Sequence, residues 1–273
     1  MSNELPLILV TNDDGIRSPG LRAAVEAMLG LGDLLVVAPC RQWSGASRCL
    51  PSNSTGTVHP HPMEVAGEGI EAFCVDGAPA QAVLHAVLEL TPRQPDLLVV
   101  GVNYGENLGA DVTISGTVGA ALQGAACGIP ALAVSLQTPK ETHNSPSEDV
   151  DFTAATHFAR LFARRMLEVP LPFDVDILKI DVPDDATPET PWRLTRVSRH
   201  TYFCPISPPR DSFSQPLRMD YYAHWDPQAL EPDSDIHALA VDRVVSVAPL
   251  SLDLTSRADP GQVESLLRGP TEL

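Results

Sequence analysis

Continuous runs of apolar residues, separated by stretches with helical spacing, are the main pattern along the first two thirds of the chain. A run of this kind is typical of a strand that is buried on both faces of a parallel sheet. The runs predict strands at residues 5–11, 33–39, 70–75, 97–102, 131–135 and 176–182.

Apolar residues with helical spacing lie between these predicted strands. Ser18 and Pro19 are typical of a helix start, with Ser as N-cap and Pro at the first helical position. Strands that alternate with helices indicate βαβ units. The sequence therefore predicts an α/β fold, with a three-layer, Rossmann-like and mainly parallel sheet. Further helices are predicted at residues 79–90, 117–127 and 151–168.

The pattern changes near residue 185. Residues 187–235 are rich in Pro, Ser and Arg and hold seven of the 14 aromatic residues of the chain. Short strands at 218–222 and 243–247 fit a hairpin-like extension, which is either a decorated edge of the core or an oligomerisation arm, because aromatic residues are enriched in interfaces. We expect three regions: a catalytic core at 1–185, a protruding arm at 186–240, and a C-terminal strand and tail at 241–273.

The chain is strongly acidic. It has 18 Lys and Arg against 35 Asp and Glu, and 18 − 35 gives a formal net charge of −17. A duplex nucleic acid requires a basic face and an anionic membrane requires basic segments, so the composition argues against both partners. No apolar run approaches the roughly 18 residues of a membrane helix, and the first residues include Glu4 but no basic region typical of a signal peptide. We expect a cytoplasmic protein.

The five cysteines form no CxxC pair. Their spacing gives no even disulfide framework, so the sequence predicts free thiols in a reducing compartment. They are Cys40, Cys49, Cys74, Cys127 and Cys204.

Polar residues follow three of the predicted strands. In an open parallel sheet, ligands bind outside the carboxyl ends of the strands. Each group alone is more typical of a turn, a loop or an N-cap, but together they predict a site at one edge of the sheet. They are Asn12, Asp13 and Asp14 after the first strand, Ser44 and Gly45 after the second, and Asn103 after the fourth, with Ser115, Gly116 and Thr117 opening the next helix.

The chemistry of this set indicates a hard cation and a phosphate. Carboxylate, hydroxyl and amide oxygens are the ligands that Mg²⁺ and Mn²⁺ prefer, and the N–H groups at a helix start favour a phosphate. The sequence has no GxxxxGK[ST] loop, no GxGxxG after a strand, and no GxSxG or HExxH motif. These absences argue against the enzyme classes that depend on those motifs.

Four blocks of the sequence, in order, resemble one known family. They are LVTNDDGIRSPGL at 9–21, VVAPCRQWSGAS at 36–47, VDGAPAQAV at 75–83 and the long segment at 95–135. The blocks resemble the SurE family of survival-protein phosphatases, which are metal-dependent 5′/3′-nucleotidases. The resemblance covers roughly residues 5 to 185 and is fainter in the block at 244–255.

The resemblance implies a phosphatase that hydrolyses nucleoside 5′- or 3′-monophosphates, of the 5′-nucleotidase type. It implies a SurE-like fold with a swapped or protruding C-terminal arm, and a homodimer or homotetramer. It also implies one divalent metal ion per subunit, Mg²⁺ or Mn²⁺. The implied metal ligands are Asp13, Asp14, Ser44 and Asn103, the two aspartates being catalytic, and the implied phosphate site is Asn12, Gly45, Asn103, Ser115, Gly116 and Thr117.

The chain departs from the family pattern at Cys40, Trp43 and Gln81, where the family usually has Asp, often a basic residue, and Asp. Trp43 either stacks on a base or packs against its own loop. Two alternatives follow from the residues. One is a nucleotide-binding regulatory protein with little turnover. The other is a haloacid-dehalogenase-like phosphatase with Asp13 as nucleophile, which requires a Lys at the phosphate.

Overall fold

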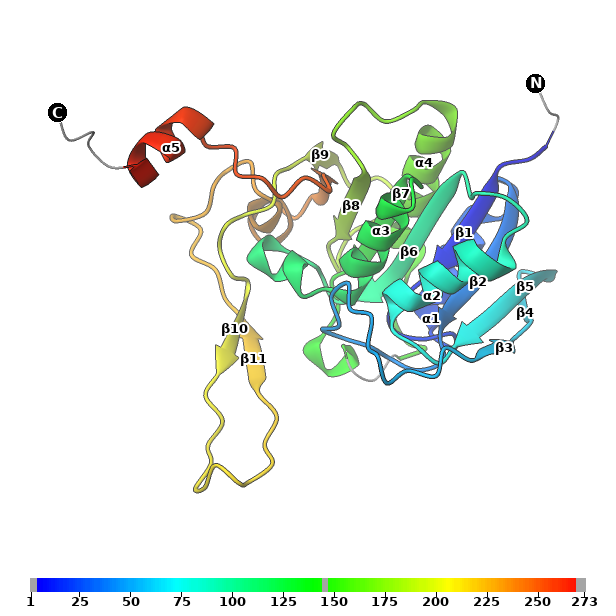
Figure 1. Cartoon of the computed structure of the whole chain (residues 1–273), viewed down its shortest axis with the longest axis horizontal. Helices are drawn as coiled ribbons and strands as arrows, with labels where there is room; N and C mark the ends of the chain where they lie inside the picture. The colour runs from blue at the N-terminus through cyan, green and yellow to red at the C-terminus, as the bar shows by residue number, and fades with distance from the viewer. Residues whose placement is uncertain (1–3, 144–146, 269–273) are drawn as a thin grey trace.

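A ten-stranded mixed sheet forms the centre of the molecule in the computed structural model, which describes residues 4–143 and 147–268 (Figure 1). Residues 1–3 and 144–146 of the predicted core and residues 269–273 of the predicted tail lie outside this description. In spatial order the strands are β3 (Val58–Pro60), β5 (Glu68–Val75), β2 (Asp33–Pro39), β1 (Leu7–Thr11), β6 (Leu97–Tyr104), β7 (Ala131–Leu136), β8 (Ile177–Val182), β12 (Val245–Leu250) and β9 (Trp192–Leu194), with β4 (Met63–Val65) paired to β5.

The six consecutive strands from β5 to β8 are parallel to one another, and helices cover both faces of the sheet. This arrangement confirms the predicted α/β fold. On one face lie α1 (Pro19–Met28) and α4 (Thr153–Glu168), and on the other α2 (Pro79–His85) and α3 (Gly116–Ala126). Shorter turns of helix are η1 (Ala86–Leu90), η2 (Gly109–Thr113), η3 (Lys140–Thr142) and η4 (His237–Val241), and α5 (Pro260–Arg268) follows near the C-terminus.

Strand β1 shows why the apolar runs are continuous. Its residues are all buried. Ile8 and Val10 join the apolar core under α1 and α4, whereas Leu9 joins the core under α2 and α3. Because successive side chains point to opposite faces, a strand covered on both sides must be apolar throughout. The predicted bounds of β2 are those observed, and the other predicted strands differ by a few residues.

The helix start predicted at Ser18 and Pro19 is confirmed, with Ser18 in an extended conformation before the first turn. The next residue, Gly20, lets α1 lie directly on β6, since a Cβ there would be 2.1 Å from the carbonyl oxygen of Val102. The close approach brings the loop between β1 and α1 against the end of β6.

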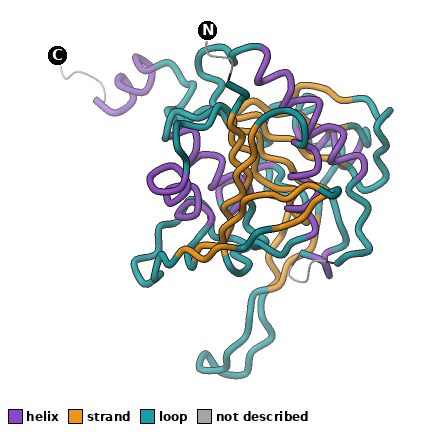
Figure 2. Tube along the Cα trace, turned by 90° about the vertical axis from the view of Figure 1, so that its right-hand side faces the viewer, coloured by secondary structure: helices purple, strands orange, loops and turns teal. Residues whose placement is uncertain are grey.

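The region after residue 185 divides into two parts. Strands β10 (Phe203–Ile206) and β11 (Asp220–Ala223) form a separate antiparallel hairpin that projects from the body (Figures 1 and 2). The strand expected at 243–247 in the hairpin-like extension is instead β12, which returns to the main sheet between β8 and β9. Its apolar residues decide this, because Val245 and Val247 are buried in the core under α1 and α4.

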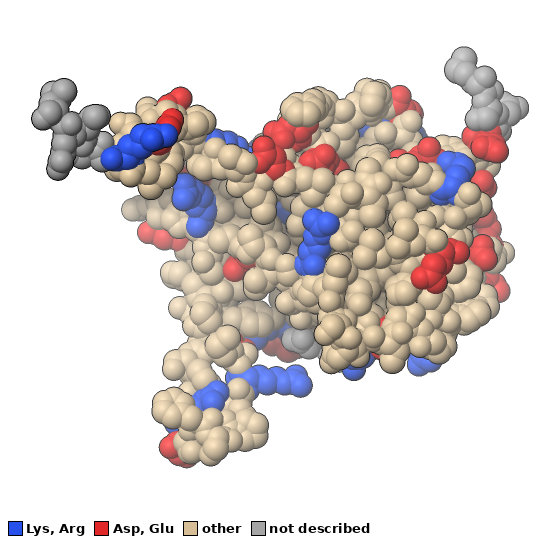
Figure 3. All heavy atoms as spheres, viewed as in Figure 1, with Lys and Arg blue, Asp and Glu red and all other residues tan. Residues whose placement is uncertain are grey.

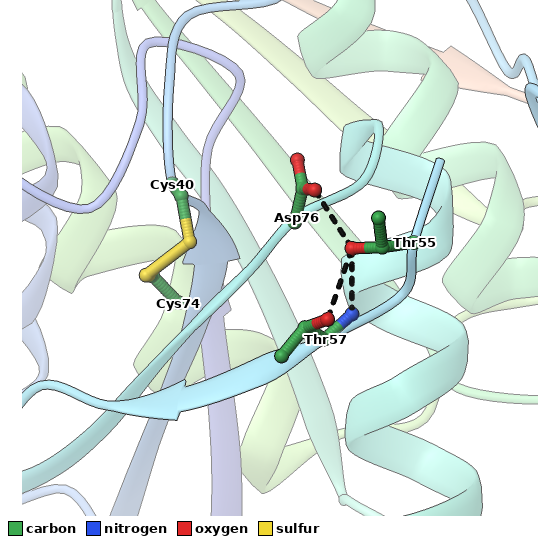
Figure 4. The surroundings of a disulfide bond; sticks show 5 residues. All are labelled: Cys40, Thr55, Thr57, Cys74 and Asp76. Atoms are coloured by element: carbon green, nitrogen blue, oxygen red, sulfur yellow. Dashed lines mark hydrogen bonds between the residues drawn. A yellow bond between two sulfur atoms is a disulfide. The ribbon is translucent and has the colours of Figure 1, made fainter. Parts of the chain in front are cut away.

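The prediction of five free thiols is wrong for one pair. Cys40 and Cys74 form a disulfide (Figure 4), while Cys49, Cys127 and Cys204 are free. The parallel pairing of β2 with β5 brings the two residues together, and the Cys40 amide donates to the Val75 carbonyl at 2.9 Å. No spacing rule reveals a pair 34 residues apart. A cross-link over a loop of this length stabilises a fold by about 3–4 kcal/mol in the chain-entropy account.

Basic side chains are scattered singly or in small groups over the face seen in Figure 3. Among the helices of the described ranges, none combines the length and the apolar character needed to cross a membrane.

Candidate active site

Three chain segments meet at the carboxyl edge of the sheet, as the sequence predicts. Strand β1 lies between β2 and β6 and is parallel to both, so the loops that follow these strands emerge side by side. The Trp43 amide donates to the Asp13 carbonyl at 2.8 Å, and the Ser47 amide donates to the Ile114 carbonyl at 3.0 Å. The loop after β2 is thus tied to the loop after β1 and to the segment before α3.

Asp13 lies against the start of α3. Its carboxylate is 4% exposed, and Oδ1 accepts a hydrogen bond from the Thr117 hydroxyl at 2.6 Å. A Cβ on Gly116 would lie 2.6 Å from Asp13 Oδ2, so only glycine permits this approach. Burial raises the pKa of Asp13 to about 6, although the hydrogen bond from Thr117 opposes the shift.

Asp14 is the second buried carboxylate, 8% exposed. The Gln42 side-chain amide donates to Oδ1 at 3.0 Å, and the Tyr104 amide lies 3.4 Å from Oδ2. Burial, together with the charge of Asp13, raises the pKa of Asp14 to about 8. No basic side chain of the described residues contributes to either shift. Among the described residues, the two carboxyl groups therefore have no basic side chain that would stabilise their charged forms.

Ser44 and Asn103 complete the predicted set of metal ligands. Ser44 is exposed and directly follows Trp43, while Gly45 has a positive φ of 74°. Asn103 is half-buried in β6, and its side-chain nitrogen donates to the carbonyls of Gly105 at 2.7 Å and Tyr104 at 3.3 Å. These two bonds occupy the nitrogen and leave Oδ1 as the atom of Asn103 that suits a cation.

Several predicted phosphate residues have side chains that are engaged within the protein. The Asn12 side chain exchanges two hydrogen bonds of 3.2 Å with the Gly15 backbone and so closes the turn that carries the aspartates. Ser115 is the N-cap of α3, accepting from the Val118 amide at 3.0 Å, and Thr117 donates to Asp13. Ser115 and Thr117 can therefore offer a phosphate their backbone N–H groups at the start of α3.

A close packing contact holds the loop after β2 on α3. A Cβ on Gly119 would lie 2.1 Å from the Ser47 carbonyl oxygen. Arg48 also donates to the Gln123 side chain of α3 at 2.9 Å. The Cys40–Cys74 disulfide fixes the beginning of the same loop on β5. The loop is therefore held at both ends.

The departures from the family pattern have local structural roles. Trp43 is half-buried, and the Arg41 guanidinium lies 5.2 Å from the centre of its ring. Gln81 caps α2, since its side chain accepts from the Ala78 amide at 2.9 Å and donates to the Pro51 carbonyl at 3.2 Å. Neither residue contacts Asp13 or Asp14 through a side-chain hydrogen bond of the described structure.

Sequence reasoning missed Gln42 and His143. Gln42 donates to Asp14 and also to the His143 carbonyl at 2.7 Å. The only available signal for Gln42 was its position two residues before Ser44. His143 lies in the connection after β7 and has no such signal, because only the tertiary structure brings it to this edge.

The donor atoms fit a hard divalent cation. In the described ranges no group of three or more His, Cys, Asp or Glu side chains is arranged to hold a metal. The candidate set instead consists of oxygens from two Asp, one Ser and one Asn. Two adjacent buried carboxylates with raised pKa values present uncompensated charge, which a divalent cation with oxygen ligands neutralises.

Comparisons with known proteins find similar sequences and a similar structure along most of the chain. The family model described as "Survival protein SurE" matches residues 8–203. The 5′-nucleotidase SurE of Thermococcus gammatolerans is 40% identical over 266 residues, covering 96% of each chain. That of Methanothrix thermoacetophila is 38% identical over 267 residues, covering 95% of this chain and 98% of the relative. The crystal structure of the Aquifex aeolicus Sure protein has a TM-score of 0.71 and 29% identity, over 96% of this chain and 100% of that one.

Proposed function

The chain belongs to the SurE family, and from this membership we propose that it is a 5′-nucleotidase that hydrolyses nucleoside monophosphates to a nucleoside and phosphate. The observation that carries the proposal is the buried pair Asp13 and Asp14 in the loop after β1, where Asp13 lies against the start of α3. Relatives with almost the same length as this chain are named 5′-nucleotidase SurE, which supports the same activity here.

One divalent cation per subunit, Mg²⁺ or Mn²⁺, is part of the proposal. Asp13, Asp14, Ser44 and Asn103 supply the oxygens that hold it. When bound, the cation supplies Lewis-acid stabilisation of the negative charge on the phosphate. The buried carboxylates require this compensation, since the described part of the chain places no Lys or Arg beside them.

The chain itself binds and orients the phosphate. The first turn of α3, opened by Ser115 and Gly116, offers N–H groups and a favourable dipole to the phosphoryl oxygens. Gly45, exposed in the opposite loop, leaves room for the substrate. Asn12 acts indirectly by closing the turn that presents the aspartates. The attacking water forms a new P–O bond and transfers a proton to Asp13 or Asp14, while the ester P–O bond breaks and the leaving nucleoside oxygen takes up a proton.

Phosphate release from AMP and GMP tests the proposal. We expect turnover with Mg²⁺ or Mn²⁺ and its loss in EDTA, with recovery when the metal is added back. The same panel, extended to 3′-monophosphates and short polyphosphates, defines the substrate range. Turnover that is indifferent to EDTA contradicts the metal requirement, and tight nucleotide binding without turnover supports a regulatory role instead.

The proposal also covers the organisation of the chain. The chain divides into a catalytic core at 1–185, an arm at 186–240 and a C-terminal strand and tail at 241–273, and copies of the chain assemble through the arm. The hairpin carries exposed apolar side chains, with Phe213 95% and Met219 74% exposed, and such side chains favour an interface. We expect a homodimer or homotetramer, which sedimentation of the full chain measures. A monomer at micromolar concentration contradicts this part of the proposal and leaves the nucleotidase activity unaffected.

A further inference from the structure

Gln42 joins three segments of the chain at the candidate site. Its side-chain nitrogen donates to Asp14 Oδ1 at 3.0 Å and to the His143 carbonyl at 2.7 Å. A primary amide has two N–H groups, so both are used. The side chain therefore bridges the loop after β2, the loop after β1 and the connection after β7.

The acceptor at His143 is itself held in place. The His143 ring is bonded to the Tyr221 hydroxyl at 2.9 Å and to the Thr138 carbonyl at 3.1 Å. It also lies against Gly105, where a Cβ would be 2.7 Å from Nε2. Because the ring is fixed on three sides, the backbone at His143 gives Gln42 a stationary anchor.

Lys140 attaches the same connection to the projecting hairpin. Its ammonium forms an ion pair with Asp220 and donates to the Tyr221 carbonyl at 2.5 Å. Residues 140–143 are thus joined to β11 at two points. The base of the hairpin supports the anchor that Gln42 uses.

The two donors on Asp14 fix the orientation of its carboxylate. Gln42 occupies one oxygen, and the Tyr104 amide faces the other. Hydrogen bonds to a ligating carboxylate orient it, and removing such outer partners typically costs 10–100-fold in metal affinity or activity. The Asp14 carboxylate is therefore held in one rotation before any cation arrives.

We propose that Gln42 is a positioning residue that orients the Asp14 carboxylate for the divalent cation, with the His143 carbonyl as its anchor. This inference rests on the proposed metal-dependent function. It concerns a residue outside the metal-ligand set and assigns the Gln42 side chain no contact with substrate.

The test compares Gln42→Met with the parent protein. Met has a similar volume but no N–H group, so the variant loses both hydrogen bonds. The first readout is the dissociation constant for Mn²⁺, measured on the full chain from the electron paramagnetic resonance signal of free Mn²⁺. We expect it to rise about 10–100-fold. The second readout is turnover of AMP, which we expect to recover largely at excess Mn²⁺ because Asp14 itself remains.

Gln94→Met is the matched control. The Gln94 nitrogen also makes two hydrogen bonds, to the carbonyls of Cys127 at 3.1 Å and Gly128 at 3.0 Å. Gln94 precedes β6 and so lies at the opposite edge of the sheet. This control loses the same type and number of bonds, and we expect its Mn²⁺ affinity to equal that of the parent.

The possible results separate the two proposals. A parent that binds Mn²⁺ and releases phosphate, with an unchanged Mn²⁺ affinity in the Gln42→Met variant, overturns the role of Gln42 alone. A parent that neither binds Mn²⁺ nor releases phosphate overturns the proposed function and this inference with it.

If Gln42→Met fails to fold, Gln42→Asn shortens the side chain by one methylene and keeps its polarity. We expect weaker Mn²⁺ binding there too, and parental affinity in that variant overturns the proposal.

Discussion

Two clusters of buried carboxylates lie at the carboxyl edge of the same sheet and are treated in opposite ways. At the end of β8, Lys179 lies between Asp181 and Asp235, and all three side chains are fully buried. At the end of β1, Asp13 and Asp14 are buried without a basic side chain from the described residues. The first cluster holds a cation of the chain itself, whereas the second has no basic side chain of the described residues beside it.

The Lys179 cluster is also complete in its hydrogen bonds. Lys179 donates to the Asn107 carbonyl at 2.7 Å, and the Asn107 amide donates to Asp181 at 2.8 Å. Asp235 accepts from the amides of Gly109, Ser198 and Ile236 at 2.9–3.1 Å. Burial opposes the charge on Lys179, but the two aspartates outweigh it and raise its pKa. The cluster thus joins the loop after β6 to β8 and to the C-terminal region.

This contrast teaches how to distinguish structural from functional acids. Buried charges in a finished structural cluster are paired and hydrogen-bonded, because an unpaired buried charge is costly. A buried acidic pair without a partner indicates that the compensating charge arrives with a ligand. Burial raises the pKa values of Asp13 and Asp14, and no basic side chain of the described residues opposes the shift.

Removing the internal cation is expected to have the largest effect. Lys179→Met leaves two buried aspartates unpaired, and breaking a buried pair in this way costs about 3–5 kcal/mol of unfolding free energy. Urea denaturation measures the change. Lys140→Met is the control, since its pair with Asp220 is exposed and worth about 0–1 kcal/mol. A cost below about 1 kcal/mol for Lys179→Met contradicts the structural role of this cluster.

Neutralising the other cluster is expected to affect activity rather than folding. Asp13→Asn keeps an oxygen for the Thr117 hydroxyl but removes one charge of the metal site. We expect kcat/KM with Mn²⁺ to fall by more than about 100-fold. Loss of a metal ligand should exceed the 10–100-fold loss that typically follows removal of a hydrogen-bond partner of a ligand. The free energy of unfolding of the metal-free protein should not decrease. Asp33→Asn, at the exposed start of β2, is the control, and retention of full activity in Asp13→Asn shows that the site is misplaced.

A gradual pH dependence of stability is expected for the metal-free protein. The folded-state pKa values of Asp13 and Asp14 are about 6 and 8, above the unfolded value of 3.8. The folded state therefore holds protons that the unfolded state releases, and stability is lost as pH rises through 6 and 8. In EDTA we expect the unfolding free energy to fall from the unfolded pKa of 3.8 up to the folded value of about 8, by at most about 1.4 kcal/mol per pH unit for each titrating group.

The comparison with Asp13→Asn isolates the contribution of the aspartate pair. Burial also raises the pKa of Glu106 to about 7, which adds a slope of the same sign. That contribution is common to both proteins, so the parent should show the steeper decline. Identical curves for the parent and Asp13→Asn count against the uncompensated charge of this cluster.

Much of the fold was predictable from local patterns. Strand β2 has the predicted bounds because an apolar run between charged and proline residues leaves few alternatives. The hairpin was less predictable, since its strand β10 contains Pro205 and lies mostly exposed, without an alternating pattern. Strand β12 carries a clear apolar signal, yet its partner β8 lies far away in sequence, so its place in the main sheet was not predictable.

The candidate site also contains residues that were predictable from local patterns and residues that were not. Asp13, Asp14 and Asn103 were predictable because each lies at or just after the carboxyl end of a buried strand, and parallel strands bring such positions to one edge. Gln42 and His143 were not, since their roles depend on a bridge between residues 101 positions apart. The disulfide between Cys40 and Cys74 also depends on strand pairing rather than on spacing.

The α/β architecture and the edge at which polar residues gather follow from local patterns, because a strand buried on two faces is apolar throughout and parallel strands end at the same edge. Which buried acids lie beside a cation depends instead on tertiary packing. Lys179 and Asp181 lie two residues apart in one strand. Asp235 lies just before η4, more than fifty residues later in the chain, and still contacts Lys179. Charge compensation depends on distances in space, and these are set by the packing of elements that are remote in the chain.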